Sequence, residues 1–158
     1  MKKSTDRFRK SGTAGSHDVK RVYIDANAVI YYIEQNPRYL AGMLRLMFGA
    51  DGSDLVHCVT SDLVRLESRV LPLRNLNLLL LSRFDAFFDV NQAHSVRLDS
   101  AVFDFATELR AQHGLKTPDA LHLAAALQAG CDEFWTNDQR LAKAAQNRLR
   151  IVTFESTP

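Results

Sequence analysis

Four acidic side chains lie in or beside places where a strand passes into a helix or a helix begins: Asp25, Glu67, Asp119 and Asp138. Asp25 directly follows a short apolar run, and an unpaired carboxylate buried there would cost several kcal/mol. Four carboxylates in one crevice would repel one another, and a divalent cation would relieve that repulsion. Oxygen donors without His or Cys at ligand spacing favour Mg²⁺ or Mn²⁺ over zinc. We therefore interpret these acids as one metal-binding cluster.

Three of the acids also have a purely structural explanation. Asp119 can complement the dipole of a helix near its first turn. Glu67 lies between Arg65 and Arg69 in sequence and can belong to a solvated helix face. Asp138 can cap the helix that follows it. Taken singly, these explanations compete with metal binding, whereas Asp25 needs water, a partner or a metal.

Strand and helix patterns alternate along the chain. We expect strands at 22–24, 55–59, 133–136 and 151–154. Helices are expected through Ile33, at 39–48, from Thr60 or Ser61 to an interruption at Pro72, and at 76–88, 95–112, 117–130 and 139–145. In the sixth of these, Thr117, Pro118 and Asp119 fit the positions Ncap, N1 and N2.

This alternation predicts an α/β fold of three layers, with a central parallel sheet covered by helices on both faces. Sheets of this kind bind ligands just beyond the carboxyl ends of their strands. Asp25 and Asp138 fall at such ends, and the helix-borne Glu67 and Asp119 can face the same crevice.

Four segments carry a resemblance to a known family: Val22-Tyr23-Ile24-Asp25-Ala26-Asn27, Thr60-Ser61 to Glu67, Pro118-Asp119-Ala120-Leu121-His122-Leu123-Ala124 and Thr136-Asn137-Asp138. In this order they resemble the PIN domains, and among them the VapC-type toxins of bacterial and archaeal toxin–antitoxin pairs. The resemblance spans residues 22–154. It implies a PIN-like, metal-dependent endoribonuclease in which Asp25, Glu67, Asp119 and Asp138 are both catalytic residues and metal ligands.

The implied reaction is an in-line displacement at a phosphodiester. One or two Mg²⁺ or Mn²⁺ ions would bind the scissile phosphate, activate water and stabilise the leaving 3′ oxygen, giving 5′-phosphate ends. No histidine is needed as base, so we assign His57, His94, His113 and His122 to structure or surface, although His122 lies one turn from Asp119.

The first motif departs from the family at Ala26, where a Thr or Ser hydroxyl is common. Asn27 and Thr136 are polar residues that can orient carboxylates or water, or can be ordinary residues at a helix start.

The expected partners are RNA, a VapB-like antitoxin and a second copy of the chain. Lys116, Arg140 and Lys143 lie near the acidic motifs and can contact phosphates or be solvated surface charge. The apolar stretch from Leu76 to Phe88 can pack in the core, form a homodimer interface or bind the antitoxin. An antitoxin of this family is expected to occupy the crevice with a basic side chain.

Other functional classes fit less well. A haloacid-dehalogenase-like phosphatase needs a second Asp where Asn27 stands, and neither GxGxxG nor GxxxxGK[ST] occurs. A catalytically inert PIN-like scaffold that binds RNA or protein remains the alternative.

Length and composition bound the remaining expectations. The chain has 158 residues, enough for one domain, and a formal net charge of +2, which leaves its function open. Residues 1–20 predict a disordered basic tail, or an arm that contacts RNA, before a single domain at 21–158. Cys58 and Cys131 are expected to be buried reduced thiols. Because no apolar run approaches the ~18 residues of a membrane span, we expect a cytoplasmic protein.

Overall fold

The computed structural model describes residues 19–154, so nearly all of the predicted tail lies outside the described residues. Five parallel strands form one sheet: β1 (Lys20–Ile24), β2 (Val56–Ser61), β3 (Ser95–Val96), β4 (Glu133–Trp135) and β5 (Arg150–Val152). Their order across the sheet is β3-β2-β1-β4-β5. The parallel sheet is the one that the alternation of strands and helices predicts.

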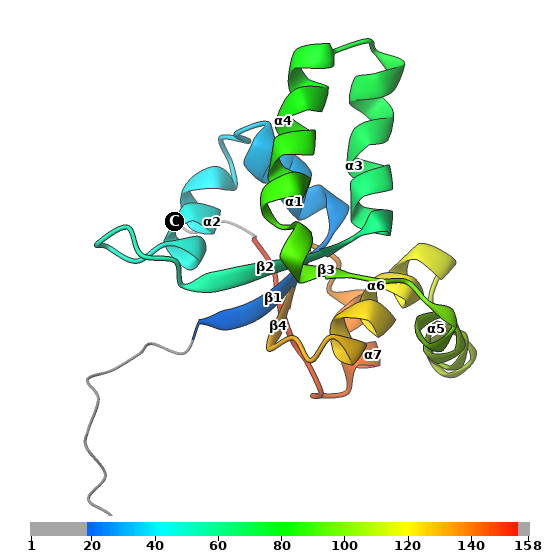
Figure 1. Cartoon of the computed structure of the whole chain (residues 1–158). Helices are drawn as coiled ribbons and strands as arrows, with labels where there is room; N and C mark the ends of the chain where they lie inside the picture. Colours follow the sequence, from blue (N-terminus) through cyan, green and yellow to red (C-terminus); the bar gives the residue numbers. More distant parts are fainter. Residues whose placement is uncertain (1–18, 155–158) are drawn as a thin grey trace, which may run out of the picture.

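Within residues 19–154, seven helices cover the two faces of this sheet. They are α1 (Ala26–Ile33), α2 (Leu40–Met47), α3 (Asp62–Arg74), α4 (Leu78–Val90), α5 (Ser100–His113), α6 (Thr117–Gln128) and α7 (Arg140–Ala145), with a short 3₁₀ turn, η1 (Gln92–His94). Helices α1 to α4 lie on one side and α5 to α7 on the other (Figure 1). The three-layer αβα fold is therefore confirmed. In the described part of the chain, no helix is long and apolar enough to cross a membrane.

The strand order reverses between β1 and β4. From β1 the chain moves outward to β2 and β3, then returns to the other side of β1 to form β4 and β5. Ile24 pairs with Trp135, so the residues that follow these two strands emerge side by side. Crevices of this kind, where neighbouring crossovers leave in opposite directions, are the usual ligand sites of open parallel sheets.

Three local predictions are wrong. Helix α3 continues through Pro72 to Arg74, because a proline in the last turn removes only one helical hydrogen bond. Residues Ser95–Val96 form β3, and α5 begins after Asp99, whose side chain accepts a hydrogen bond from the Val102 N–H. The N-cap of α6 is Lys116, so Asp119 occupies N3 rather than N2.

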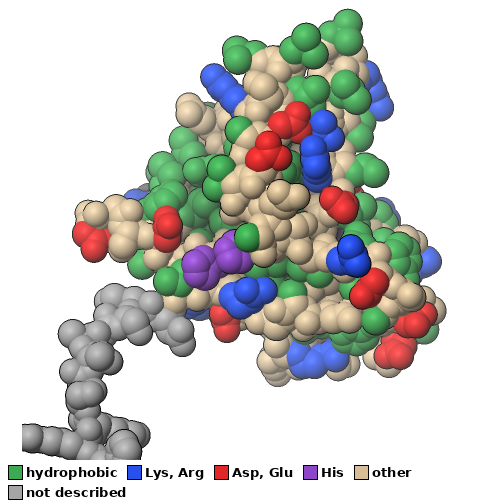
Figure 2. Space-filling model, viewed as in Figure 1, with side chains coloured by type: hydrophobic (Ala, Val, Ile, Leu, Met, Phe, Trp, Pro, Cys, Tyr) green, Lys and Arg blue, Asp and Glu red, His purple; other side chains and the backbone are tan. Residues whose placement is uncertain are grey.

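The α3–α4 hairpin projects from the sheet and carries leucines into solvent. Leu76, Leu78 and Leu79 are 80%, 69% and 69% exposed, and Leu71 and Leu73 of α3 are exposed as well. Figure 2 shows hydrophobic side chains over the tip of this hairpin. Of the three alternatives for the stretch from Leu76 to Phe88, core packing holds for Phe84 and Phe88 but not for its exposed first turn. We call Leu71, Leu73, Leu76, Leu78 and Leu79 the leucine tip.

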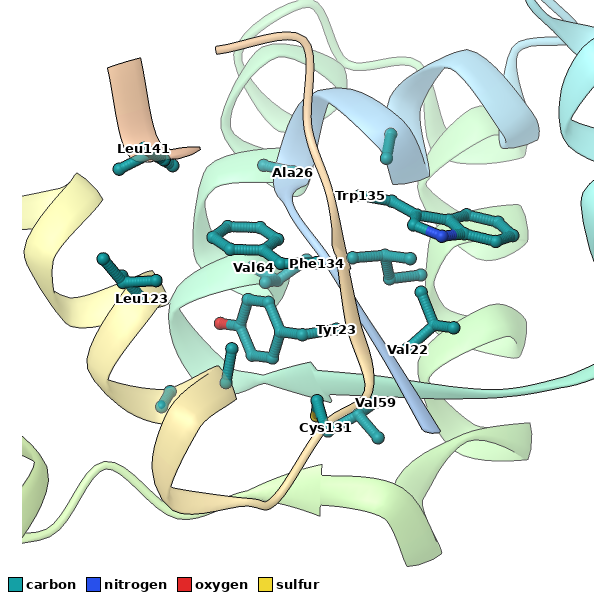
Figure 3. Packing of buried hydrophobic residues seen from close by; sticks show 14 of the residues in the cluster. Val22, Tyr23, Ala26, Val59, Val64, Leu123, Cys131, Phe134, Trp135 and Leu141 are labelled. Carbon is teal, nitrogen blue, oxygen red and sulfur yellow. The ribbon is translucent and has the colours of Figure 1, made fainter. Parts of the chain in front are cut away.

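The core lies between the sheet and both helical layers. Val22 and Tyr23 of β1 and Phe134 of β4 are fully buried, and the rings of Tyr23 and Phe134 meet edge to face with centroids 5.1 Å apart. Figure 3 shows the hydroxyl of Tyr23 directed towards α6. Both cysteines are buried and free, as predicted. Tyr23 thus brings a hydroxyl into the interior, where Ser61 and His122 are buried as well.

Candidate active site

A cavity of about 310 Å³ opens beyond the carboxyl ends of β1 and β4. We call it the acid cavity. Its polar lining consists of Asp25, Asn27, Asp119, His122, Thr136, Asn137 and Asp138, and its apolar lining of Phe134 and Leu141. Three of the four predicted acids therefore line one cavity at the edge of the sheet. The fourth, Glu67, does not line it but contacts His122, which does.

Asp25 begins α1 and is held from several directions. Its Oδ1 accepts a hydrogen bond of 2.8 Å from the Ala28 N–H, which caps the helix. Burial raises the pKa of Asp25 above its ordinary value, although hydrogen bonds from Thr136 and Ala28 and the nearby His122 lower it in part. Desolvation of the charged form outweighs these contacts. A cation bound beside Asp25 would therefore stabilise its ionised form.

Asp138 and Asp119 share a guanidinium. The Nη2 and Nε of Arg140 donate hydrogen bonds of 2.5 and 2.9 Å to the two carboxylate oxygens of Asp138. The same Nη2 lies 3.8 Å from Oδ2 of Asp119. Hydrogen bonding by Arg140 lowers the pKa of Asp138, and the charge of Lys116 acts in the same direction. Asp138 is therefore ionised and already has a cationic partner.

Glu67 reaches the site through a chain of hydrogen bonds. Its Oε2 lies 2.9 Å from Nε2 of His122, and because a carboxylate only accepts, Nε2 carries the shared proton. The other ring nitrogen, Nδ1, lies 2.9 Å from the Tyr23 hydroxyl, which is 2.8 Å from Oγ of Ser61. Burial raises the pKa of Tyr23, so its hydroxyl stays protonated. This chain links α3, β1, β2 and α6 across the end of the sheet.

The acids suit a hard divalent cation by chemistry, since they offer only oxygen. Their present arrangement is looser than a finished metal site, because among residues 19–154 no three acidic, histidine or cysteine side chains are grouped to hold an ion. Two contacts separate them: Arg140 binds Asp138, and His122 binds Glu67. The acid cavity thus has the donors of a metal site, one of which, Asp138, is bound by a guanidinium from the neighbouring cavity.

The supporting polar residues have distinct roles. Thr136 hydrogen-bonds Asp25, and its Oγ1 accepts from the Asp138 N–H at 3.1 Å, so it connects two of the acids. Asn27 lines the acid cavity. Asn137 binds the segment that follows β5 instead, accepting from the Phe154 N–H at 2.8 Å. Thr136 therefore orients carboxylates, whereas Asn137 positions the loop that carries Asp138.

Sequence reasoning missed two side chains that shape the site. His122 is buried and joins Glu67 to the cavity, although we assigned it to structure or surface. Its signal is a lone polar residue one turn after Asp119 on an otherwise apolar stretch. Arg140 was considered as a phosphate contact or as solvated surface charge, and its place two residues after Asp138 is what lets it bind both oxygens of that carboxylate.

Comparisons with known proteins agree with this fold. The family model described as "PIN domain" matches residues 22–147. None of the curated proteins matches the chain.

Among solved structures, a chain of VapBC2 from Rickettsia felis, bound to a DNA fragment from their promoter, superposes with a TM-score of 0.64 and 15% identity, over 85% of this chain and 99% of that one. A toxin–antitoxin complex from Klebsiella pneumoniae gives 0.59 and 16%, over 86% and 99%. FitAcB from Neisseria gonorrhoeae gives 0.62 and 17%, over 82% and 95%. At these identities the likeness concerns the fold.

Desolvation of the Asp25 carboxylate predicts that the free energy of unfolding depends on pH. Because the raised pKa makes the folded protein bind the Asp25 proton more tightly than the unfolded chain does, stability should fall as pH rises from about 4 through the pKa of folded Asp25. Asp25→Asn keeps a good N-cap and removes the charge, so this fall should shrink. Urea unfolding in EDTA at a series of pH values measures it.

The same change at Asp99 is the matched control. Asp99 also caps a helix, accepting from the Val102 N–H at 3.1 Å, but it is exposed. Asp99→Asn should therefore keep the wild-type pH dependence. Parallel stability curves for wild type and Asp25→Asn would show that burial of this carboxylate carries no such cost.

Proposed function

Since the chain belongs to the PIN domain family, we propose that it is an endoribonuclease that hydrolyses RNA phosphodiesters with a divalent cation, Mg²⁺ or Mn²⁺. The cation would be held by Asp25, Asp119 and Asp138, with Glu67 as a fourth acid that acts beside or through His122. The observation that carries the proposal is the meeting of three acids in one cavity at the strand-order reversal, with the half-buried Asp25 among them. A cation bound there supplies charge neutralisation at the scissile phosphate and activation of water.

The chain's own residues then organise the reaction. The Ala28 N–H and Thr136 fix the direction of Asp25, so its oxygens are oriented before substrate arrives. Phe134 and Leu141 form an apolar wall of the acid cavity that limits bulk water beside the acids. Arg140, once released from Asp138, can turn to a phosphate oxygen, for which a guanidinium has matching geometry.

We further propose that this nuclease is the toxin of a VapBC-type pair. Support comes from similar folds within a VapBC2 complex and a toxin–antitoxin complex. A VapB-like antitoxin would inhibit it by bringing a basic side chain to the acids, and Arg140 demonstrates within the chain that a guanidinium fits between Asp138 and Asp119. Adding such an antitoxin to the purified chain should abolish cleavage.

An inert scaffold that binds RNA or protein is the second candidate. One observation favours it: in the described part of the chain, no three candidate ligands are grouped to hold a metal. Direct measurement of cleavage separates the two candidates.

Metal-dependent cleavage is the first prediction of this proposal. Purified protein should cut single-stranded or structured RNA in Mg²⁺ or Mn²⁺, leave 5′-phosphate ends and stop in EDTA. Asp119→Asn should lower the rate by about 10²-fold or more, the scale seen when one group that stabilises the transition state is removed. Gel mapping of end-labelled RNA measures both effects.

Asp104→Asn is the matched control, because Asp104 is an exposed acid on α5, away from the acid cavity. It should cleave like wild type. If folded wild type is inert with every metal, or if Asp119→Asn cuts as fast as Asp104→Asn, the carboxylate mechanism is wrong and the scaffold is favoured.

Arg140 and the cation should compete for the same carboxylates. Replacing Arg140 by Gln removes a positive charge that contacts Asp138 at 2.5 Å, so Mn²⁺ should bind about tenfold more tightly, a difference of about 1.4 kcal/mol. Calorimetric titration of Mn²⁺ into the EDTA-treated and dialysed protein measures this without any reference to activity.

Arg148→Gln removes the same charge from a residue that stacks over Phe105 instead. Its Mn²⁺ affinity should stay at the wild-type value. Equal affinities for wild type and Arg140→Gln would mean that the guanidinium does not obstruct the metal position.

We propose that the leucine tip is covered by a second copy of the chain. Exposed leucines on both helices of one hairpin present a contiguous apolar surface of the kind that marks an interface. Wild type should therefore be a dimer in light scattering, and Leu79→Glu should be a monomer with the circular dichroism spectrum of wild type. Val90→Glu alters an exposed position at the other end of α4 and should remain dimeric. Monomeric wild type at about 100 μM would contradict the proposal.

A further inference from the structure

A second cavity adjoins the acid cavity and has the opposite character. Its volume is about 440 Å³, and it lies between the end of α5, the start of α6 and helix α7. Lys116, Lys143, Arg140 and His113 supply its basic groups, and we call it the basic cavity. The described chain has only three lysines, and two of them line this cavity.

The two lysines of this cavity are unpaired. Among residues 19–154 neither Lys116 nor Lys143 forms an ion pair, and both are exposed. Arg140, by contrast, is bound to Asp138. The basic cavity thus offers two cations that the fold does not neutralise.

The two cavities share a wall. Asp119 and Asp138 line both, and Arg140 contacts these two acids from the basic side. A ligand that crosses this wall meets acids on one side and cations on the other. A polyanion with regularly spaced charges would fit this arrangement if a metal neutralised the acids beside one of its charges while the lysines bound its next charge.

We propose that the basic cavity binds a backbone phosphate of the RNA strand, next to the phosphate that lies at the acid cavity. Lys116 and Lys143 provide the charge that binds it. This assignment rests on the proposed nuclease function for its substrate and adds the path of the strand, which runs from the acid cavity over Asp119 and Asp138 towards α7.

The electrostatics on the two sides of the wall are already connected. The charge of Lys116 contributes to the lowered pKa of Asp138, although Arg140 is the larger cause. Lys116 is therefore close enough to act on the site without forming an ion pair with it. Phosphate contacts of this type supply affinity that is independent of base sequence and falls with added salt.

Binding without cleavage tests the assignment. Fluorescence anisotropy with a labelled single-stranded RNA in EDTA gives Kd over a range of salt concentrations for wild type and for Lys116→Gln/Lys143→Gln. The basic cavity contacts one phosphate in this assignment, and each lost phosphate contact should lower the slope of log K against log salt by about 0.7, so the double variant should lose about 0.7 and bind about tenfold more weakly at low salt. Circular dichroism and the unfolding midpoint should match wild type, because both lysines are exposed.

Arg74→Gln/Arg45→Gln makes the same change in net charge at exposed positions on α3 and α2 and should keep the wild-type slope. An unchanged slope in the lysine variant, or an equal loss in the arginine variant, would overturn the assignment. Cleavage assays separate this failure from that of the proposed function. If the protein cuts RNA but its binding does not depend on the lysines, only the assignment of the basic cavity fails. If binding depends on the lysines but no RNA is cut, that assignment holds and the proposed nuclease function fails.

Discussion

The carboxylate of Asp25 is the charge around which the rest of the site is organised. It follows β1 at the point where the strand order reverses, so the fold partly buries it at the edge of the sheet instead of leaving it on an open surface. Burial opposes its ionisation, and the neighbouring contacts from Ala28 and Thr136 offset only part of that cost. Structure alone gains little from such a residue, since a neutral Asn would cap α1 equally well. Its presence makes sense when a cation completes the site.

Most of the fold could be predicted, because a parallel sheet leaves strong local marks. Its central strands are buried on both faces and therefore appear as short apolar runs, such as Val22 to Ile24, between helical patterns. Strand β3 has only two residues, too few for any periodicity, and its neighbours were absorbed into the predicted helix. Caps differ by a residue when, as at Lys116, the capping position forms no side-chain hydrogen bond.

The candidate site was predictable as residue types and less so as contacts. Asp25 and Asp138 follow strands, so the topology brings them together once the sheet is known. Glu67 and Asp119 lie on helices, where a periodic pattern does not determine which way one side chain turns. The pairing of Glu67 with His122 and that of Arg140 with Asp138 depend on distances between elements, which no local pattern encodes. The role of the leucines at the start of α4 stayed open for a related reason: apolar composition indicates burial without telling whether the same chain or a partner covers the side chains.

Helix α3 carries both Glu67 and part of the leucine tip, and this common support has a thermodynamic consequence. The hydrogen bonds from Glu67 to His122 and on to Tyr23 join the helical layer of the hairpin to α6 on the opposite face of the sheet. If a molecule binds the leucine tip with an affinity that depends on the position of α3, its binding must also change the free energy of the contact between Glu67 and His122. By reciprocity, a ligand that draws Glu67 into the acid cavity alters the affinity at the tip by the same factor. If α3 shifts, binding at the leucine tip and binding at the acid cavity are therefore thermodynamically coupled.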